Sequence, residues 1–182
     1  MAPSIIVPTR SVNGVRIPTV GYGTMLFPEP ERAAELIQGA LECGYRHIDT
    51  ARKYGSEEWV GAGIRASGLA RKDIWVTTKV TEENAKADDF KRSVDTSLKT
   101  MGLDYVDLLL IHWPQPKVPL EETLDALAQA KKDGLAKNIG VSNFTVALLD
   151  EAVAKCPEPL LTSKQLEQTS NILRRGLHCV CY

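Results

Sequence analysis

The sequence predicts an α/β fold of the (β/α)8 barrel type, incomplete at about seven of eight strands and preceded by a β-hairpin. Two observations carry this prediction. Apolar runs typical of strands alternate with helical patterns along most of the chain, which favours parallel strands. Each helical pattern ends at a glycine, which can take the left-handed conformation that closes a helix, and the next strand begins shortly after. These glycines are Gly44, Gly68, Gly102, Gly134 and Gly176.

The individual elements follow from local signals. Asn13-Gly14, between apolar residues, predicts a two-residue hairpin turn within Val12 to Thr19. Pro119 and the acidic residues after it predict a helix start, and Thr145 is a suitable N-cap for a helix over Val146 to Ala154. Parallel strands are expected near Thr19–Gly21, Arg46–Asp49, Ile74–Lys79, Tyr105–His112, Asn138–Val141, Leu160–Gln165 and Leu177–Tyr182.

Length and composition exclude several classes of protein. We expect one domain over residues 1–182. Barrels of this type rarely have fewer than roughly 200 residues, so this domain is shorter than usual. A net charge of -1 offers no basic field for nucleic acid or an anionic membrane. No apolar stretch approaches the ~20 residues of a membrane span, and the N-terminal residues lack the pattern of a secretory signal. The four cysteines have no disulfide-framework spacing, which indicates a reducing, cytoplasmic setting.

Four ionisable residues lie at or just past the ends of predicted strands: Asp49, Tyr54, Lys79 and His112. Because parallel strands separated by helices place their C-terminal ends on one face, these side chains should converge there. Each of them alone has a plainer interpretation. Acids and lysines at strand ends are usually caps or surface charges, and tyrosines and histidines are more often packing residues. The combination predicts an active site, whereas His47, in mid-strand, is expected to be structural.

The residues around these four resemble the signatures of the aldo-keto reductase family. The similarity runs from about Val15 to Leu161, and its short loops are most similar to bacterial members of the diketogluconate reductase type. The matching motifs are Gly44-Tyr45-Arg46-His47-Ile48-Asp49-Thr50-Ala51, Tyr54-Gly55-Ser56-Glu57, His112-Trp113-Pro114 and Ile139-Gly140-Val141-Ser142-Asn143-Phe144.

This resemblance implies the reduction of a small aldehyde or ketone to an alcohol, with NADPH as cofactor and NADH as a further possibility. Tyr54 would give its phenolic proton to the carbonyl oxygen. A free phenol has a pKa of about 10, and the ammonium of Lys79 would lower it. Asp49 would hold Lys79 charged and in place. His112 would donate a hydrogen bond that orients the carbonyl, and Trp113 would form a wall of the substrate pocket.

The resemblance also implies residues that bind the cofactor. Ser142, Asn143 and Gln165 lie at the ends of the fifth and sixth predicted strands, where family members hydrogen-bond the nicotinamide carboxamide. The similarity weakens after Gln165 and resumes at Gly176, where the segment up to Tyr182 is similar to the family's seventh strand. Tyr182 falls where a tyrosine stacks on the nicotinamide ring.

The alternative function is a catalytically inactive, truncated remnant or a nucleotide-binding module. The family's eighth strand and its basic segment for the adenosine 2′-phosphate have no counterpart in the 182 residues. We therefore expect weak NADPH binding with little preference over NADH. The family implies a monomer, but an open barrel would leave its first and seventh strands as unpaired edges that favour self-association. No metal is expected, because His178, Cys179 and Cys181 supply too few ligands for zinc.

Overall fold

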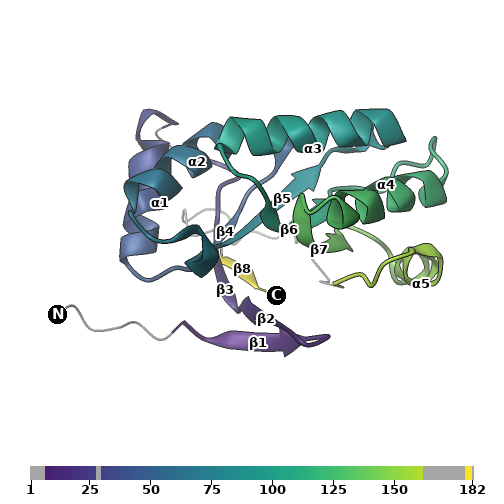
Figure 1. Cartoon of the computed structure of the whole chain (residues 1–182), viewed down its shortest axis with the longest axis horizontal. Coiled ribbons are helices and arrows are strands. Elements are labelled where there is room, and N and C mark those ends of the chain that lie inside the picture. Colours follow the sequence, from purple (N-terminus) through teal and green to yellow (C-terminus); the bar gives the residue numbers. More distant parts are fainter. Residues whose placement is uncertain (1–6, 28–29, 162–178, 182) are drawn as a thin grey trace.

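A computed structural model describes residues 7–27, 30–161 and 179–181 as an incomplete (β/α)8 barrel with helices outside the sheet (Figure 1). Within these residues the main sheet has the strand order β7-β6-β5-β4-β3-β8. Five of its strands pair in parallel, each with its neighbour along the chain. They are β3 (Val20–Gly23), β4 (His47–Asp49), β5 (Trp75–Val80), β6 (Val106–Ile111) and β7 (Ala136–Val141).

The connections between these strands are helical. The α-helices are α1 (Ala33–Glu42), α2 (Glu57–Ala66), α3 (Ala87–Met101), α4 (Leu120–Lys132) and α5 (Val146–Lys155). Short 3-10 helices precede α1 and lie in the loops after β4, α2 and β5. They are η1 (Pro30–Arg32), η2 (Arg52–Tyr54), η3 (Arg71–Asp73) and η4 (Glu82–Asn84). The loops after β4 and β5 therefore have a defined backbone on the face where the site was predicted.

The predicted hairpin is confirmed. β1 (Thr9–Val12) and β2 (Val15–Pro18) pair antiparallel. Asn13 and Gly14 form the turn with φ angles of 51° and 80°. Two central residues with positive φ give a turn whose twist matches that of the flanking strands. In Figure 1 the hairpin lies at the end of the sheet opposite to the long helix α3.

The predicted helix ends are also confirmed within the described residues. Gly102 follows α3 directly with a φ of 66°, and its N–H donates to the carbonyl of Lys99 at 3.2 Å. The other predicted glycines that the structure describes have positive φ as well, whereas Gly176 lies outside the described residues. Thr145 caps α5, because its hydroxyl accepts a hydrogen bond from the backbone N–H of Leu148.

One strand prediction was wrong. The segment near the C-terminus was expected to be a parallel strand, but β8 (Cys179–Cys181) pairs antiparallel with β3. The outer edge of β3 is therefore paired, and it is not the free edge that the sequence predicted. The physical reason is that unpaired N–H and C=O groups of an edge accept a strand in either direction. Of the predicted strand over Leu160–Gln165, Leu160 forms a parallel bridge with Ile139, and residues 162–165 lie outside the described part.

Strand β6 buries both of its faces. On β6, Leu109 and Ile111 belong to the large core that lies between sheet and helices. Leu108 and Leu110 alternate with them and pack on the other face with Ile17 of the hairpin. Successive side chains of a strand point to opposite faces, so the hairpin closes the inner core at one end.

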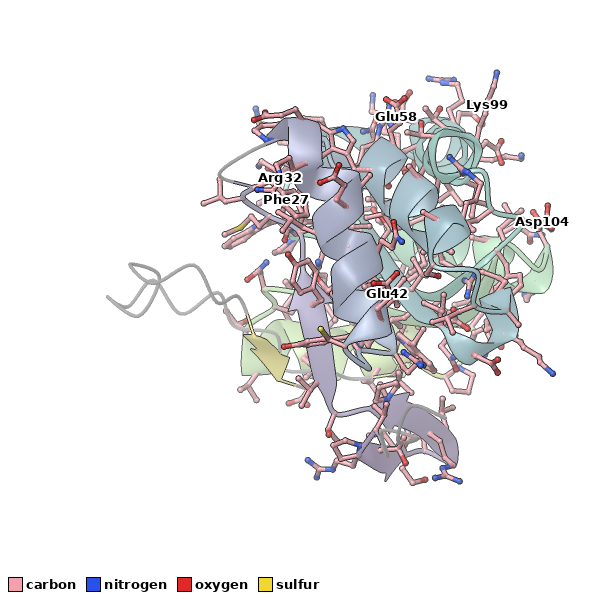
Figure 2. All side chains as sticks on the ribbon, turned by 90° about the vertical axis from the view of Figure 1, so that its left-hand side faces the viewer. Phe27, Arg32, Glu42, Glu58, Lys99 and Asp104 are labelled. Atoms are coloured by element: carbon pink, nitrogen blue, oxygen red, sulfur yellow. The ribbon has the colours of Figure 1, made fainter. Side chains whose placement is uncertain are left out.

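Helix α2 packs closely between α1 and α3, which fixes the loop that precedes it. A Cβ at Gly61 would collide with the carbonyl of Met101, and one at Gly63 would lie 2.7 Å from Cβ of Ile37. Only glycine permits this approach. Figure 2 shows the outer side of these helices, where charged side chains such as Glu58 and Lys99 point away from the core. No helix in the described part is long and apolar enough to cross a membrane.

Candidate active site

The four predicted residues come together at the C-terminal ends of the parallel strands. Asp49 ends β4, Tyr54 ends the 3-10 helix that follows it, and Lys79 lies near the end of β5. His112 directly follows β6, and its backbone N–H donates to the carbonyl of Val80 on β5. The register of the strands therefore brings residues far apart in the sequence to one edge of the sheet.

Asp49 and Lys79 form a buried ion pair. Lys79 Nζ lies 2.5 Å from Asp49 Oδ1, and their side chains are 2% and 4% exposed. The ammonium also donates to the carbonyl of Thr50 at 3.0 Å. Burial by itself would lower the pKa of Lys79, but the charge of Asp49 and the neighbouring phenol of Tyr54 outweigh it and raise this pKa. Lys79 is therefore protonated at neutral pH, although its side chain is almost inaccessible to water.

Tyr54 lies between this cation and His112. Its hydroxyl is 3.5 Å from Lys79 Nζ, and its half-buried ring meets the imidazole edge-on with centroids 5.6 Å apart. The imidazole is 2% exposed, and neither of its nitrogens has a hydrogen-bond partner among the described residues. Burial, and then the charge of Lys79, lower the pKa of His112 to about 4. At neutral pH this ring is uncharged, with one N–H to donate.

Three hydroxyl groups beneath the Tyr54 loop were not identified from the sequence. Ser56 Oγ lies 2.8 Å from the hydroxyl of Thr24 and 3.0 Å from that of Thr50, and Thr24 donates to the carbonyl of Asp49. All three residues are buried. This chain of hydrogen bonds joins the loop to the ends of β3 and β4. Isolated serines and threonines give no sequence signal for such a role, because they occur in every loop.

Glu57 was also missed as a residue of the site. It is only 2% exposed, and its carboxylate contacts Arg52 at 3.2 Å and the hydroxyl of Thr78 at 2.8 Å. An acidic residue in the first turn of a helix is common at protein surfaces, so the sequence alone indicates nothing more. A buried carboxylate, in contrast, must be matched by donors.

The rim of the site is tied together by a second ion pair. Lys53, next to Tyr54, contacts Glu82 at 2.9 Å, and the side chain of Gln115 donates to the backbone carbonyl of Glu82. These three residues belong to the loops after β4, β5 and β6. The rim therefore comes from the loops that follow the strands of the catalytic tetrad predicted from the sequence, which is Asp49, Tyr54, Lys79 and His112.

Two of the predicted cofactor-binding residues lie beside His112. Ser142 is buried and directly follows β7, and Asn143 comes next with a φ of 61°. The Asn143 amide donates to the carbonyl of His112 at 2.9 Å and to Ser142 Oγ at 3.2 Å. Trp113 is 37% exposed at the same edge. The other two predicted residues, Gln165 and Tyr182, lie outside the described residues.

His47 has the structural surroundings that the sequence predicted. It is fully buried on β4, and its Nε2 lies 2.9 Å from the hydroxyl of Thr77. Burial lowers its pKa to about 4. Gly21 on β3 leaves room for the ring, since a Cβ there would lie 3.2 Å from it.

The chain belongs to the aldo/keto reductase family, whose model matches residues 19–170. It is 39% identical over 177 residues to the methylglyoxal reductase DkgB of Salmonella typhi, covering 91% of this chain and 66% of that protein. It is 39% identical over 164 residues to a glyoxal reductase of Bacillus subtilis, covering 85% of this chain and 59% of the relative. The chain thus spans less than two thirds of the length of these relatives.

Solved structures show the same likeness. A putative 2,5-diketo-D-gluconic acid reductase B superposes with a TM-score of 0.82 and 39% identity, over 86% of this chain and 55% of that one. An aldo-keto reductase of Bombyx mori, solved in complex with NADP, superposes with a TM-score of 0.80 and 34% identity, over 86% and 57% of the two chains. The predicted family and barrel type are confirmed.

Proposed function

We propose that this chain carries the active site of a nicotinamide-dependent reductase that converts a small aldehyde or ketone to an alcohol. One observation carries the proposal: Lys79, buried and paired with Asp49, lies 3.5 Å from the hydroxyl of Tyr54. A nearby ammonium favours the phenolate over the phenol, so it makes Tyr54 a better acid at neutral pH. Asp49 offsets the cost of burying that ammonium.

Each residue of the tetrad has one part in the proposed reaction. Reduced nicotinamide, when bound, supplies the hydride that a carbonyl carbon accepts. Tyr54 gives its proton to the carbonyl oxygen, and the resulting phenolate is stabilised by Lys79 until solvent returns a proton. The uncharged His112 donates a hydrogen bond to the same oxygen. Both ring nitrogens lack a partner among the described residues, which supports this role.

The cofactor we propose is NADPH, with NADH as a weaker possibility. The residues at this edge fit a nicotinamide: Ser142 and Asn143 place a hydroxyl and an amide beside His112, which suits the donors and acceptors of a carboxamide. By resemblance, Gln165 would complete these contacts and Tyr182 would stack on the ring. The Bombyx mori relative with bound NADP supports the choice of cofactor.

The proposed substrates are small carbonyl compounds. The two bacterial relatives are named for methylglyoxal and glyoxal, which are small dicarbonyls. Trp113, which is 37% exposed beside His112, would form one wall of the substrate site. An indole gives a flat apolar surface without a charge, which suits a small carbonyl carbon chain.

The test is turnover by the purified chain. NADPH absorbance should fall when methylglyoxal or glyoxal is added, and the Tyr54→Phe variant should remain folded and bind NADPH without this loss. NADPH binding is measured separately from its fluorescence. Binding without turnover on any of several aldehydes would favour the alternative of a nucleotide-binding module, and a folded chain with neither property would contradict the proposal.

A further inference from the structure

We propose that Glu57 is a positioning residue that holds Tyr54 against Lys79. The proposal rests on the proposed role of Tyr54 as the acid. Glu57 itself touches neither Tyr54 nor Lys79 in any contact described above. One of its carboxylate oxygens contacts the loop that holds Tyr54, and the other contacts the strand that holds Lys79.

The first contact fixes the loop. Glu57 Oε2 accepts from Arg52 Nη1 at 3.2 Å, and Arg52 begins the single 3-10 turn that ends at Tyr54. Within this turn the N–H of Tyr54 donates to the carbonyl of Ala51 at 3.0 Å. Because the turn spans only three residues, an anchor at its first residue limits how far its last residue can move.

The second contact fixes the strand. Glu57 Oε1 accepts from Thr78 Oγ1 at 2.8 Å, and both residues are 2% exposed. Thr78 immediately precedes Lys79 on β5. Because successive side chains of a strand point to opposite faces, Thr78 meets helix α2 while Lys79 points to the site. Glu57 therefore binds β5 on the face opposite to the site, at the residue next to Lys79.

Burial makes this arrangement unusual for a glutamate. A carboxylate in an apolar interior is unfavourable unless each oxygen has a donor, and here each has one. The neighbouring Glu58 occupies the same helical turn with its side chain in solvent, as Figure 2 shows. The chain thus offers a matched control of identical chemistry.

The expected consequence concerns the ionisation of Tyr54. The attraction between a phenolate and an ammonium falls as their distance grows. If the loop loosens, Tyr54 Oη moves away from Lys79 Nζ, and the tyrosine becomes a weaker acid. The charged or titratable groups around Tyr54 are the Asp49–Lys79 pair, His112, the Lys53–Glu82 pair and the Arg52–Glu57 pair. Of these, only the last is altered by a change at residue 57.

The experiment is a titration of the tyrosine Cζ signals of the complete chain by carbon-13 NMR. The Tyr54→Phe variant assigns the signal of Tyr54 by its loss. Glu57→Gln keeps an oxygen for Thr78 but loses the charged contact to Arg52. Loss of the negative charge alone would lower the pKa of Tyr54, so the expected rise of about one unit reports the loosened loop. Glu58→Gln changes the charge equally and should leave the titration unchanged. The measurement needs no turnover, so it stands even if the proposed function fails.

Two further pairs of variants separate positioning from general stability. Thr78→Val removes the hydroxyl and should raise the pKa of Tyr54 in the same direction, whereas Thr78→Ser retains the hydroxyl and should restore it. Arg52→Gln alters the partner that is 38% exposed, and this chain should fold even if Glu57→Gln does not. The proposal is overturned if folded Glu57→Gln, or Thr78→Val and Arg52→Gln together, titrate as the unaltered chain does.

Discussion

Strand β6 carries the buried acid Asp107 near its start, and the buried base His112 directly follows its end. The two groups differ in their hydrogen-bond partners. At its start, both carboxylate oxygens of Asp107 have donors: Oδ2 accepts from Arg71 at 2.7 Å and from the backbone N–H of Val76, and Oδ1 contacts Lys137 at 3.3 Å. Directly after its end, His112 has no partner for either ring nitrogen among the described residues. The paired oxygens of Asp107 stabilise the fold, whereas in the proposed function the ring of His112 donates to a ligand.

Each end also has a tyrosine next to a cation. Arg71 Cζ and Lys137 Nζ lie over the ring of Tyr105, 4.3 Å and 4.0 Å from its centroid. Lys79 lies 5.0 Å from the ring centroid of Tyr54 but only 3.5 Å from its hydroxyl. The cations near Tyr105 are partly exposed, at 21% and 50% for Arg71 and Lys137, whereas Lys79 is 2% exposed. The charge of Lys79 therefore acts on the hydroxyl of Tyr54 with less screening by water.

The largest effect is expected from Asp49→Asn. It leaves the nearly fully buried ammonium of Lys79 without its counter-charge, and the chain should lose about 3–5 kcal/mol of unfolding free energy in urea. Asp104→Asn, at an exposed position labelled in Figure 2, should change it by less than about 0.5 kcal/mol. A loss from Asp49→Asn as small as that of the control would show that Lys79 does not depend on its partner.

Turnover should separate the two tyrosines. Tyr54→Phe deletes the proposed proton donor and should slow the chemical step by about 100-fold or more, while NADPH affinity barely changes. Tyr105→Phe makes the same chemical change at the other end of β6 and should leave turnover as it is. Comparable rates for the two variants, from single-turnover measurements, would remove Tyr54 from the role of acid.

A smaller effect is expected from Asp107→Asn. Its cations are partly exposed, with side-chain exposures of 21% and 50% for Arg71 and Lys137, so both can be hydrated when the charge is lost. The asparagine oxygen can still accept from Val76. We expect a loss of about 1–2 kcal/mol in urea unfolding, below that of Asp49→Asn. A larger loss from Asp107→Asn than from Asp49→Asn would contradict the expectation that partly exposed cations tolerate the loss of their counter-charge better than the buried Lys79 does.

The smallest effect concerns pH. The pKa values of His47 and His112 are lowered from 6.5 to about 4 in the folded chain, mainly by burial. The unfolded chain therefore binds protons first, and the stability these groups contribute above pH 6.5 is lost as the pH falls toward 4. Between pH 7 and 6 each histidine should account for about 0.7 kcal/mol of this loss. His47→Gln and His112→Gln should each flatten the profile, and an unchanged slope in either variant would contradict the lowered pKa.

Local signals in the sequence were sufficient for much of the fold. Asn13-Gly14 specified the hairpin turn because both residues tolerate positive φ, and Gly102 ended α3 for the same reason. The four residues of the tetrad could be predicted because parallel strands must present their C-terminal ends together. The resemblance to a family added their roles, which strand ends alone do not reveal.

The sequence by itself therefore determined the order of strands and helices, the turns between them and the edge where chemistry would gather, since these depend on neighbours in the chain. Only the tertiary structure decided which groups that edge would bury and pair. The antiparallel pairing of β8 with β3 depends on a free edge formed far away in the sequence. Likewise, the sequence does not distinguish Glu57 from Glu58. The packing of α2 buries Glu57 against Thr78 and leaves Glu58 in solvent. Burial is a property of the assembled layers, and no local pattern contains it.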